Sequence, residues 1–207
     1  MFSVKAFKSR HPDLFRYQKA EHVFVHDKIL AKTILRFFPV SITPNRVTMF
    51  RILATPLVVF LTLYGHYFSG VIAFVLVAFT DAIDGSLART RNQITRFGML
   101  FDPLADKLLI GIMVLILVFQ NFHYLLGVAL LGIEIVFMLI ALVAKARFNT
   151  VRAANVWGKI KMILQVVAVF VTLLALLFST PYLLSIAAGI FGLAIGFAII
   201  SLFAHGI

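Results

Sequence analysis

The sequence predicts an all-α integral membrane protein, in which six transmembrane helices follow an N-terminal amphipathic helix that lies at the membrane interface. Three observations support this fold class. Of the 207 residues, 62% are hydrophobic and 13% are charged, and the mean hydropathy of +1.04 lies far outside the range of soluble domains. The apolar residues form segments near the ~20 residues that a helix needs to cross a bilayer. Basic residues gather on alternate links between these segments.

The charge of the chain also indicates a membrane protein. Nineteen Lys and Arg against eight Asp and Glu give a net charge of +11, and the cations are clustered rather than scattered. Clustered cations beside apolar segments favour contact with anionic lipid headgroups, so no nucleic-acid partner is expected. The lack of cysteine excludes disulfides and thiolate metal sites.

The first predicted domain, residues 1–40, is a basic cytoplasmic segment that contains the amphipathic helix. Residues 27–38 would place apolar side chains on one helical face and basic side chains on the other. The apolar face would hold Leu30, Ile34, Phe37 and Phe38, and the basic face Lys28, Lys32 and Arg36. This pattern is typical of a helix lying in the headgroup plane, and a solvated basic arm is the alternative.

The second predicted domain, residues 41–207, is a six-helix membrane domain. Its apolar segments are 47–65, 70–88, 98–120, 124–144, 160–179 and 182–204. The short links at 65–68, 120–123 and 179–182 contain no Lys or Arg. The positive-inside rule therefore places both termini and the basic links on the cytoplasmic side of a multi-pass protein.

Half of the acidic residues lie in one stretch between the second and third spans: Asp81, Asp84, Asp102 and Asp106. The uninterrupted apolar run of the third span, residues 108–119, is too short to cross a bilayer alone, so its helix must extend back through the last two acids. By the same logic the second helix extends through the first two. The spacings i, i+3 and i, i+4 put each pair on one helical face, and neighbouring helices can point both pairs at each other.

These recessed carboxylates predict a metal site at the cytoplasmic edge of the membrane. Like charges in a poorly hydrated place repel each other unless cations neutralise them. Hard oxygen ligands without Cys or a local His favour Mg²⁺ or Mn²⁺, and four carboxylates could hold two divalent ions, as in many phosphoryl-transfer sites. Gly85 and Gly98 leave room for a close ligand or backbone. The pattern indicates a phosphate-containing substrate at the membrane surface.

Eight positions in this stretch match the spacing D-x2-D-G-x2-A-R-x8-G-x3-D-x3-D without a gap. They are Asp81, Asp84, Gly85, Ala88, Arg89, Gly98, Asp102 and Asp106. The chain therefore resembles the CDP-alcohol phosphotransferase family, whose members have six transmembrane helices preceded by an amphipathic helix. The resemblance implies a transferase of phospholipid biosynthesis, which moves a substituted phosphoryl group from a CDP-linked donor to an alcohol and releases CMP.

The resemblance also implies a role for each residue of the signature. The metal ligands would be Asp81, Asp84 and Asp102. Asp106 would be the general base and could also touch a metal. The CDP donor would be bound by Gly85, Ala88, Arg89 and Gly98. Analogy with families of this kind gives a homodimer as the expected oligomeric state.

Three further stretches resemble particular members of the family. TPNRVTMFR (43–51), FDPLADK (101–107) and GKIK (158–161) are similar to phosphatidylglycerophosphate synthases and to eukaryote-type cardiolipin synthases. The resemblance implies CDP-diacylglycerol as donor and glycerol 3-phosphate as acceptor, with phosphatidylglycerol as the alternative acceptor. Asn45 would hydrogen-bond the donor. The acceptor phosphate would be bound by Arg147, Arg152 and Lys159. Arginine suits this role because its guanidinium can form two parallel hydrogen bonds to a phosphate.

Two other classes of function remain alternatives. Intramembrane acids also mark ion pathways, so a divalent-cation transporter is one of them. Transporters tend to bind their ions near the bilayer midplane between repeats, whereas these acids lie at one edge and no repeat is visible. A non-catalytic scaffold is the other alternative, and it would not need the complete signature.

Overall fold

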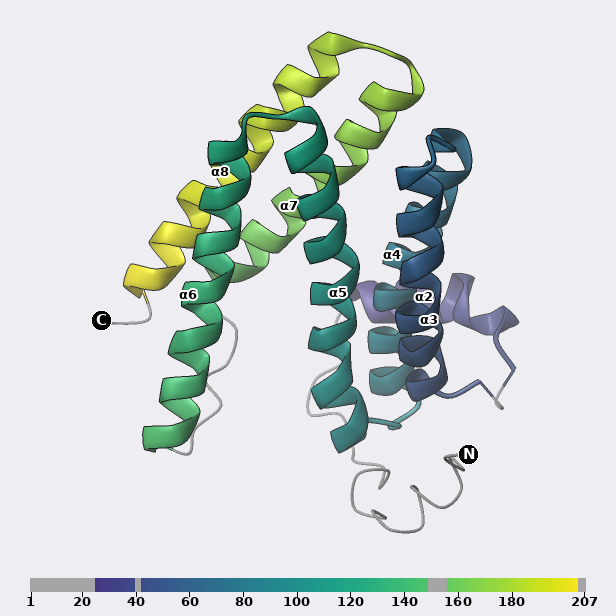
Figure 1. Cartoon of the computed structure of the whole chain (residues 1–207). Helices are drawn as coiled ribbons and strands as arrows, with labels where there is room; N and C mark the ends of the chain where they lie inside the picture. The colour runs from purple at the N-terminus through teal and green to yellow at the C-terminus, as the bar shows by residue number, and fades with distance from the viewer. Residues whose placement is uncertain (1–24, 40–41, 149–155, 205–207) are drawn as a thin grey trace, which may run out of the picture. The chain divides into compact units, whose positions relative to one another are not determined.

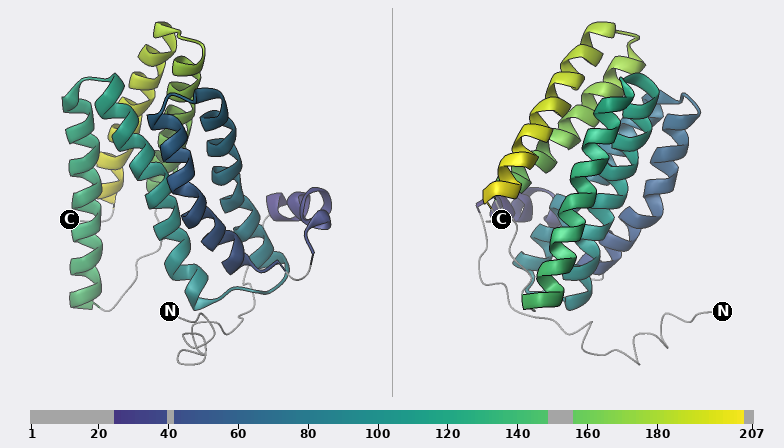
Figure 2. Two further views of the ribbon diagram at one scale, coloured as in Figure 1. Left: turned by 45° about the vertical axis from the view of Figure 1, so that its right-hand side comes forward. Right: turned by 60° about the vertical axis from the view of Figure 1, so that its left-hand side comes forward.

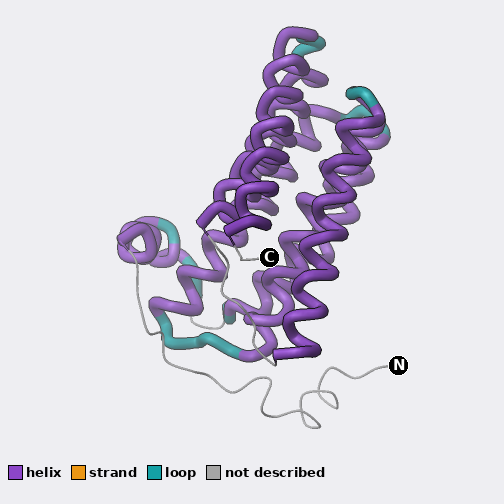
Figure 3. The backbone as a smooth tube through the Cα atoms, turned by 90° about the vertical axis from the view of Figure 1, so that its left-hand side faces the viewer, coloured by secondary structure: helices purple, strands orange, loops and turns teal. Residues whose placement is uncertain are grey.

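The computed structural model describes residues 25–39, 42–148 and 156–204, and every regular element in these ranges is a helix (Figures 1 and 3). The elements are α2 (Val25–Thr33), the 3₁₀ helix η2 (Leu35–Phe37), α3 (Pro44–Leu63), α4 (Tyr67–Thr90), α5 (Arg96–Asn121), α6 (Tyr124–Phe148), α7 (Val156–Leu177) and α8 (Pro181–Ala204). Each apolar segment expected to span the membrane coincides with one helix, from α3 to α8. The prediction of an all-α fold is confirmed for the residues that the structure describes.

Local sequence signals set the ends of these helices. Pro44 and Pro181 occupy the first positions of α3 and α8, where the missing N–H would have no partner within the helix. Gly65, in the turn after α3, has a φ of +76°, which glycine adopts without steric cost. The hydroxyl of Thr95 accepts a hydrogen bond of 3.0 Å from the amide of Gly98, as an N-cap residue of α5 does.

Four of the described helices are long and apolar enough to cross a membrane: Pro44–Leu63, Tyr67–Thr90, Val156–Leu177 and Pro181–Leu202. A shorter apolar helix, Tyr124–Leu139, belongs to the part of α6 whose side chains are described. Large apolar side chains are exposed along these helices, as is expected where lipid covers them. Several apolar helices of this length are characteristic of a multi-pass membrane protein.

The helix expected over residues 27–38 is divided in the structure. It ends as α2 at Thr33, and η2 follows as a separate 3₁₀ turn. A proline disfavours helical backbone in the residue before it, and Phe38, which precedes Pro39, is accordingly extended at φ −87° and ψ 116°. Lys28 and Lys32 are exposed as expected, whereas the side chain of Phe37 lies outside the described part of the chain.

The described residues form two compact units. The first combines those up to Leu61 with Ile72–Leu109, and so contains α2, η2, most of α3 and α4, and the beginning of α5. Its buried residues Leu35, Ile83 and Leu87 make a cluster against which Ile34 and Phe38 pack, so apolar side chains of the N-terminal segment contact α4. Helices α3 and α4 lie side by side and antiparallel (Figure 2).

The second unit combines Thr62–Val71 with the remainder of the chain from Ile110. In it α7 and α8 form an antiparallel hairpin that packs along its length (Figure 2). The interior of this unit is filled by apolar residues such as Met113, Leu173 and Phe191, each with no exposed surface. The first unit alone contains the acidic residues of the signature.

Candidate functional site

The four acidic residues of the signature meet around one arginine of α3. The guanidinium of Arg51 donates hydrogen bonds to Asp81 Oδ1 at 2.9 Å and to Asp84 Oδ2 at 2.6 Å. It also forms an ion pair with Asp106, which belongs to α5, whereas Asp81 and Asp84 belong to α4. The carboxylates of the two helices therefore face each other as the helical spacing predicts, and a cation lies between them.

Thr48, one turn before Arg51 on α3, brings the fourth carboxylate into the cluster. Its hydroxyl oxygen lies 2.7 Å from Asp102 Oδ1 and 3.2 Å from Asp84 Oδ2. A hydroxyl has one proton to donate, and the shorter of these distances is to Asp102. Thr48 and Arg51 are three positions apart and so lie on one face of α3. The side chains of this face contact all four carboxylates.

The cluster is buried on one side and open on the other. Arg51 has no exposed side-chain surface and Asp84 only 2%, whereas Asp106 is 18% exposed and Asp81 45%. One guanidinium against four carboxylates leaves an excess of negative charge in this partly dry place. A site of this kind attracts further cations through its open side.

The donor set fits a hard divalent ion. Apart from Arg51, the side chains of the cluster offer carboxylate or hydroxyl oxygens, which Mg²⁺ and Mn²⁺ prefer, and three carboxylates already converge on one positive group. Within the described ranges no three acidic or histidine side chains are close enough to share one ion. The guanidinium of Arg51 occupies the place between them, so ion binding at that place requires Arg51 to move.

The two glycines of the signature lie directly against polar side chains. A Cβ added at Gly85 would come within 3.2 Å of Nη1 of Arg89. One added at Gly98 would come within 3.4 Å of Asn45 Oδ1, which in turn accepts a hydrogen bond of 2.8 Å from Thr95. Ala88 is half-buried near the end of α4. Both glycines therefore face polar groups that the sequence assigns to the donor site.

The basic residues expected to bind the acceptor belong to the second unit. Lys159 is exposed in the first turns of α7. Arg147 belongs to the last turn of α6, and its side chain, like the whole of Arg152, lies outside the described part of the chain. Lys161 forms an ion pair with Glu134 of α6, whose carboxylate also accepts a hydrogen bond of 3.1 Å from Gln165. Glu134 therefore orients a cationic neighbour.

Sequence reasoning overlooked two residues of the cluster, Arg51 and Thr48. Both belong to the stretch TPNRVTMFR, but neither received a role. Arg51 carried a usable signal, because a charged residue inside an apolar span needs a partner or a polar cavity. Thr48 carried none, since threonine is common in such helices and often bonds its own backbone, as Thr48 also does with Pro44 at 3.3 Å.

Replacing Arg51 should destabilise the protein. In Arg51→Met, Asp84 would remain buried without its ion-pair partner, and breaking a buried pair typically costs about 3–5 kcal/mol. We expect the thermal unfolding temperature in detergent to fall, and added Mg²⁺ to restore part of the loss because the ion replaces the missing charge. Arg46→Met, at an exposed position of the same helix, is the matched control. An equal, small effect of both substitutions would contradict this account of the cluster.

The sequence matches one protein family and several named relatives. A sequence model described as CDP-alcohol phosphatidyltransferase matches residues 41–200. A protein of Rickettsia typhi named CDP-diacylglycerol--glycerol-3-phosphate 3-phosphatidyltransferase is 40% identical over 77 residues, which are 36% of this chain and 43% of the relative. Proteins of the same name are 32% identical over 150 residues in Wigglesworthia glossinidia brevipalpis, and 34% identical over 147 residues in Bacillus subtilis.

These matches differ in how much of each protein they cover. The Wigglesworthia match includes 69% of this chain and 80% of the relative, and the Bacillus match 63% and 76%. With the rickettsial relatives the chain spans less than half of their length, 43% in Rickettsia typhi. The family match is the most extensive and contains every residue of the acidic cluster.

Proposed function

The chain belongs to the CDP-alcohol phosphatidyltransferase family, and from this membership we propose that it transfers a phosphatidyl group from CDP-diacylglycerol to glycerol 3-phosphate and releases CMP. The donor and acceptor are those in the names of the relatives from Rickettsia, Wigglesworthia and Bacillus. The reaction belongs to phospholipid biosynthesis. The observation that carries the proposal is the meeting of the four signature carboxylates on one face of α3, where three pair with Arg51 and Asp102 is hydrogen-bonded to Thr48.

In the proposed reaction Asp106 is the general base. The acceptor hydroxyl oxygen forms a bond to the phosphorus that carries the diacylglycerol, and the bond from that phosphorus to the oxygen of CMP breaks. The hydroxyl proton passes to a carboxylate oxygen of Asp106, which is within the cluster but partly exposed and so accessible to an acceptor. CMP leaves with the electron pair of the broken bond.

Asp81, Asp84 and Asp102 are the proposed ligands of Mg²⁺ or Mn²⁺, and Asp106 completes a set that suits two ions. When bound, the ions would neutralise the donor diphosphate and the negative charge that develops on CMP. The protein contributes fixed carboxylates on two helices and the bridging hydroxyl of Thr48, which holds Asp102 and Asp84 near each other. Asn45, Gly85, Ala88, Arg89 and Gly98 are the proposed contacts to the donor.

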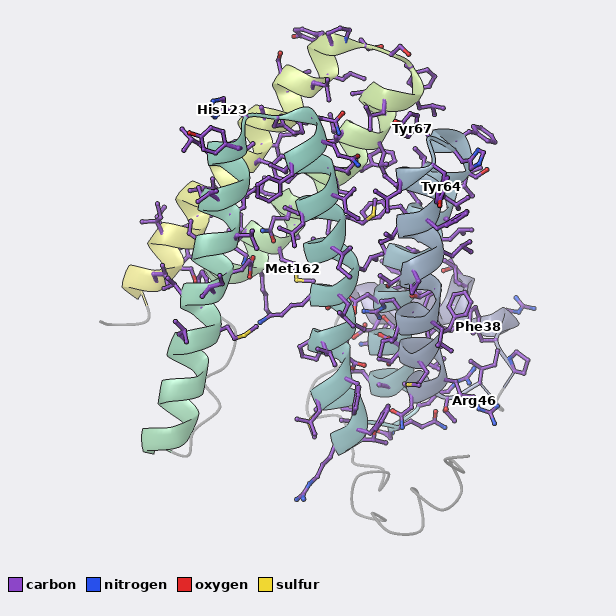
Figure 4. The ribbon with its side chains drawn as sticks, viewed as in Figure 1. Phe38, Arg46, Tyr64, Tyr67, His123 and Met162 are labelled. Carbon is purple, nitrogen blue, oxygen red and sulfur yellow. The ribbon has the colours of Figure 1, made fainter. Side chains whose placement is uncertain are left out.

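The proposed topology has six spans, with both termini and the active site on the cytoplasmic side. The acids lie near the end of α4 and the beginning of α5; the link between these helices carries Arg91, and Arg96 begins α5. Tyr64, in the turn between α3 and α4, and Tyr67, the first residue of α4, are labelled in Figure 4, and tyrosine is enriched at membrane interfaces. A homodimer, and a basic cytoplasmic segment of residues 1–40 with an interfacial helix before the membrane domain of residues 41–207, belong to the same proposal.

The acceptor is tested by incubating purified protein with CDP-diacylglycerol and one candidate alcohol at a time, with the lipid product identified by mass. We expect phosphatidylglycerophosphate from glycerol 3-phosphate, with one CMP released per lipid formed. If phosphatidylglycerol is used and glycerol 3-phosphate is not, the protein is a cardiolipin synthase. If no alcohol supports CMP release, the proposed activity is wrong.

Neutralising the proposed acceptor site should weaken acceptor binding. We expect Lys159→Gln, and Arg147→Gln and Arg152→Gln likewise, to raise KM for glycerol 3-phosphate by about tenfold, because each loses one charged hydrogen bond to phosphate. KM for CDP-diacylglycerol should stay close to its original value. Arg36→Gln, at an exposed position of η2, controls for the loss of one surface charge. Equal changes in both KM values would contradict the assignment.

A further inference from the structure

Asp27, in the first turn of α2, is a buried carboxylate that contacts the signature arginine. It has no exposed surface. Its Oδ2 accepts a hydrogen bond of 2.8 Å from Nε of Arg89, and its Oδ1 accepts one of 2.8 Å from Nη2 of the same residue. Oδ1 also accepts a hydrogen bond of 2.6 Å from the hydroxyl of Ser86. An acid from the N-terminal segment thus binds two residues of α4.

The two parallel hydrogen bonds fix the plane of the Arg89 guanidinium. Arginine and carboxylate match each other as a two-pronged fork, so the side chain cannot rotate without breaking both bonds. Arg89 is 28% exposed and Asp27 not at all, so separation would leave a buried charge without its partner. The position of Arg89 therefore depends on Asp27.

The guanidinium held in this way lies against the acidic cluster. A Cβ at Gly85 would be 3.2 Å from Nη1 and 3.3 Å from Nη2 of Arg89. The guanidinium therefore lies over Gly85, the residue that follows Asp84 in α4. It is also close enough to interact electrostatically with Asp81 and Asp84. A cation fixed beside these acids is well placed to meet the phosphates of a ligand that the cluster binds.

We propose that Asp27 is a positioning residue for the CDP-linked donor, because it holds Arg89 in the orientation that meets the donor diphosphate. The proposal rests on the proposed function, in which Arg89 contacts the donor. It makes α2 part of the active site and assigns the N-terminal segment a role beyond contact with lipid. Residues that precede the transmembrane helices then determine donor affinity.

The N-terminal segment has other contacts that keep it in place when Asp27 is replaced. Leu35 of η2 is buried with Ile83 and Leu87 of α4, and Ile34 packs against them. Arg91 donates a hydrogen bond of 2.7 Å to the carbonyl oxygen of Phe38. We therefore expect a substitution at Asp27 to alter the position of Arg89 more than the packing of residues 34–38 against α4.

The test compares steady-state kinetics of the full-length protein with those of Asp27→Asn. Asparagine keeps the size of the side chain, but it removes the negative charge and can accept from Arg89 at one atom only. We expect KM for CDP-diacylglycerol to rise about tenfold or more, with smaller changes in kcat and in KM for glycerol 3-phosphate. Lys28→Gln, the exposed neighbour on the same helix, should leave all three values near the original.

Two further variants separate positioning from a merely structural contact. Ser86→Ala removes a link between α2 and α4 but leaves the pair of Asp27 and Arg89, so it should raise donor KM much less than Asp27→Asn does. In an Arg89→Ala background, Asp27→Asn should add nothing to donor KM, because there is no guanidinium left to position. If Asp27→Asn does not fold, Asp27→Glu keeps the charge but displaces it, and should raise donor KM in the same way.

The outcomes distinguish this inference from the function on which it rests. If Arg89→Ala raises donor KM and the Asp27 variants do not, Asp27 is not a positioning residue, although the proposed function stands. Additive effects of Asp27→Asn and Arg89→Ala would also overturn the inference. If Arg89→Ala leaves donor KM unchanged, the donor assignment of Arg89 fails and the role of Asp27 fails with it.

Discussion

Excess EDTA should abolish CMP release by the purified protein, and Mg²⁺ or Mn²⁺ should restore it. Four carboxylates face a single guanidinium in a partly buried cluster. The donor brings a diphosphate to the same place, so the negative charges of the cluster and the donor would repel each other unless cations neutralise them. We therefore expect activity to fall to the detection limit.

The matched control for this experiment is EDTA already saturated with Mg²⁺, which should have no effect. It separates removal of the ion from any effect of the chelator on the detergent or lipid. CMP release that continues undiminished in excess free EDTA would show that the carboxylates do not act through a divalent ion.

Asp106→Asn should lower turnover by about 10²–10⁴-fold, which is the usual contribution of a general base. Asparagine has nearly the same shape but cannot take the proton of the acceptor hydroxyl. Asp106 also pairs with Arg51, and this ion pair would be lost as well. Arg51 retains Asp81 and Asp84 as partners, so we expect the variant to fold and to bind donor with a smaller change in affinity.

Lys107→Gln, which alters the exposed residue next to Asp106, serves as a control for local changes in α5. Turnover should be measured with saturating donor and acceptor, so that changes in KM do not contribute. Near-normal turnover in Asp106→Asn would transfer the role of base to another group.

The sequence predicted the helices and the meeting of the acids because both depend on local patterns. Apolar segments of about 20 residues became α3 to α8, and their ends are set by local signals such as Pro44 and Pro181. The spacing of Asp81 and Asp84 on one helix puts their carboxylates on one face, whatever the rest of the chain does. A short link makes α4 and α5 neighbours in the chain, and this was enough to predict that the acids of the two helices face each other.

Contacts between distant parts of the chain were not predictable in the same way. Asp27 and Arg89 are 62 positions apart, and no periodic pattern relates them. Asp27 stands beside Lys28 in a basic segment, so its sequence context suggests a solvated surface rather than a buried ion pair. The end of η2 at Phe37 was recognisable in principle, because Pro39 restricts the backbone of Phe38.

The most direct test of the acidic cluster is Mn²⁺ binding to the purified protein, followed by electron paramagnetic resonance of the free ion. Binding requires neither donor nor acceptor, so it examines the carboxylates alone. We predict that the unchanged protein takes up Mn²⁺, that Asp81→Asn, Asp84→Asn and Asp102→Asn each weaken binding strongly, and that Lys107→Gln does not. Equal Mn²⁺ binding by the unchanged protein and all three aspartate variants would contradict the proposal that these carboxylates hold the metal.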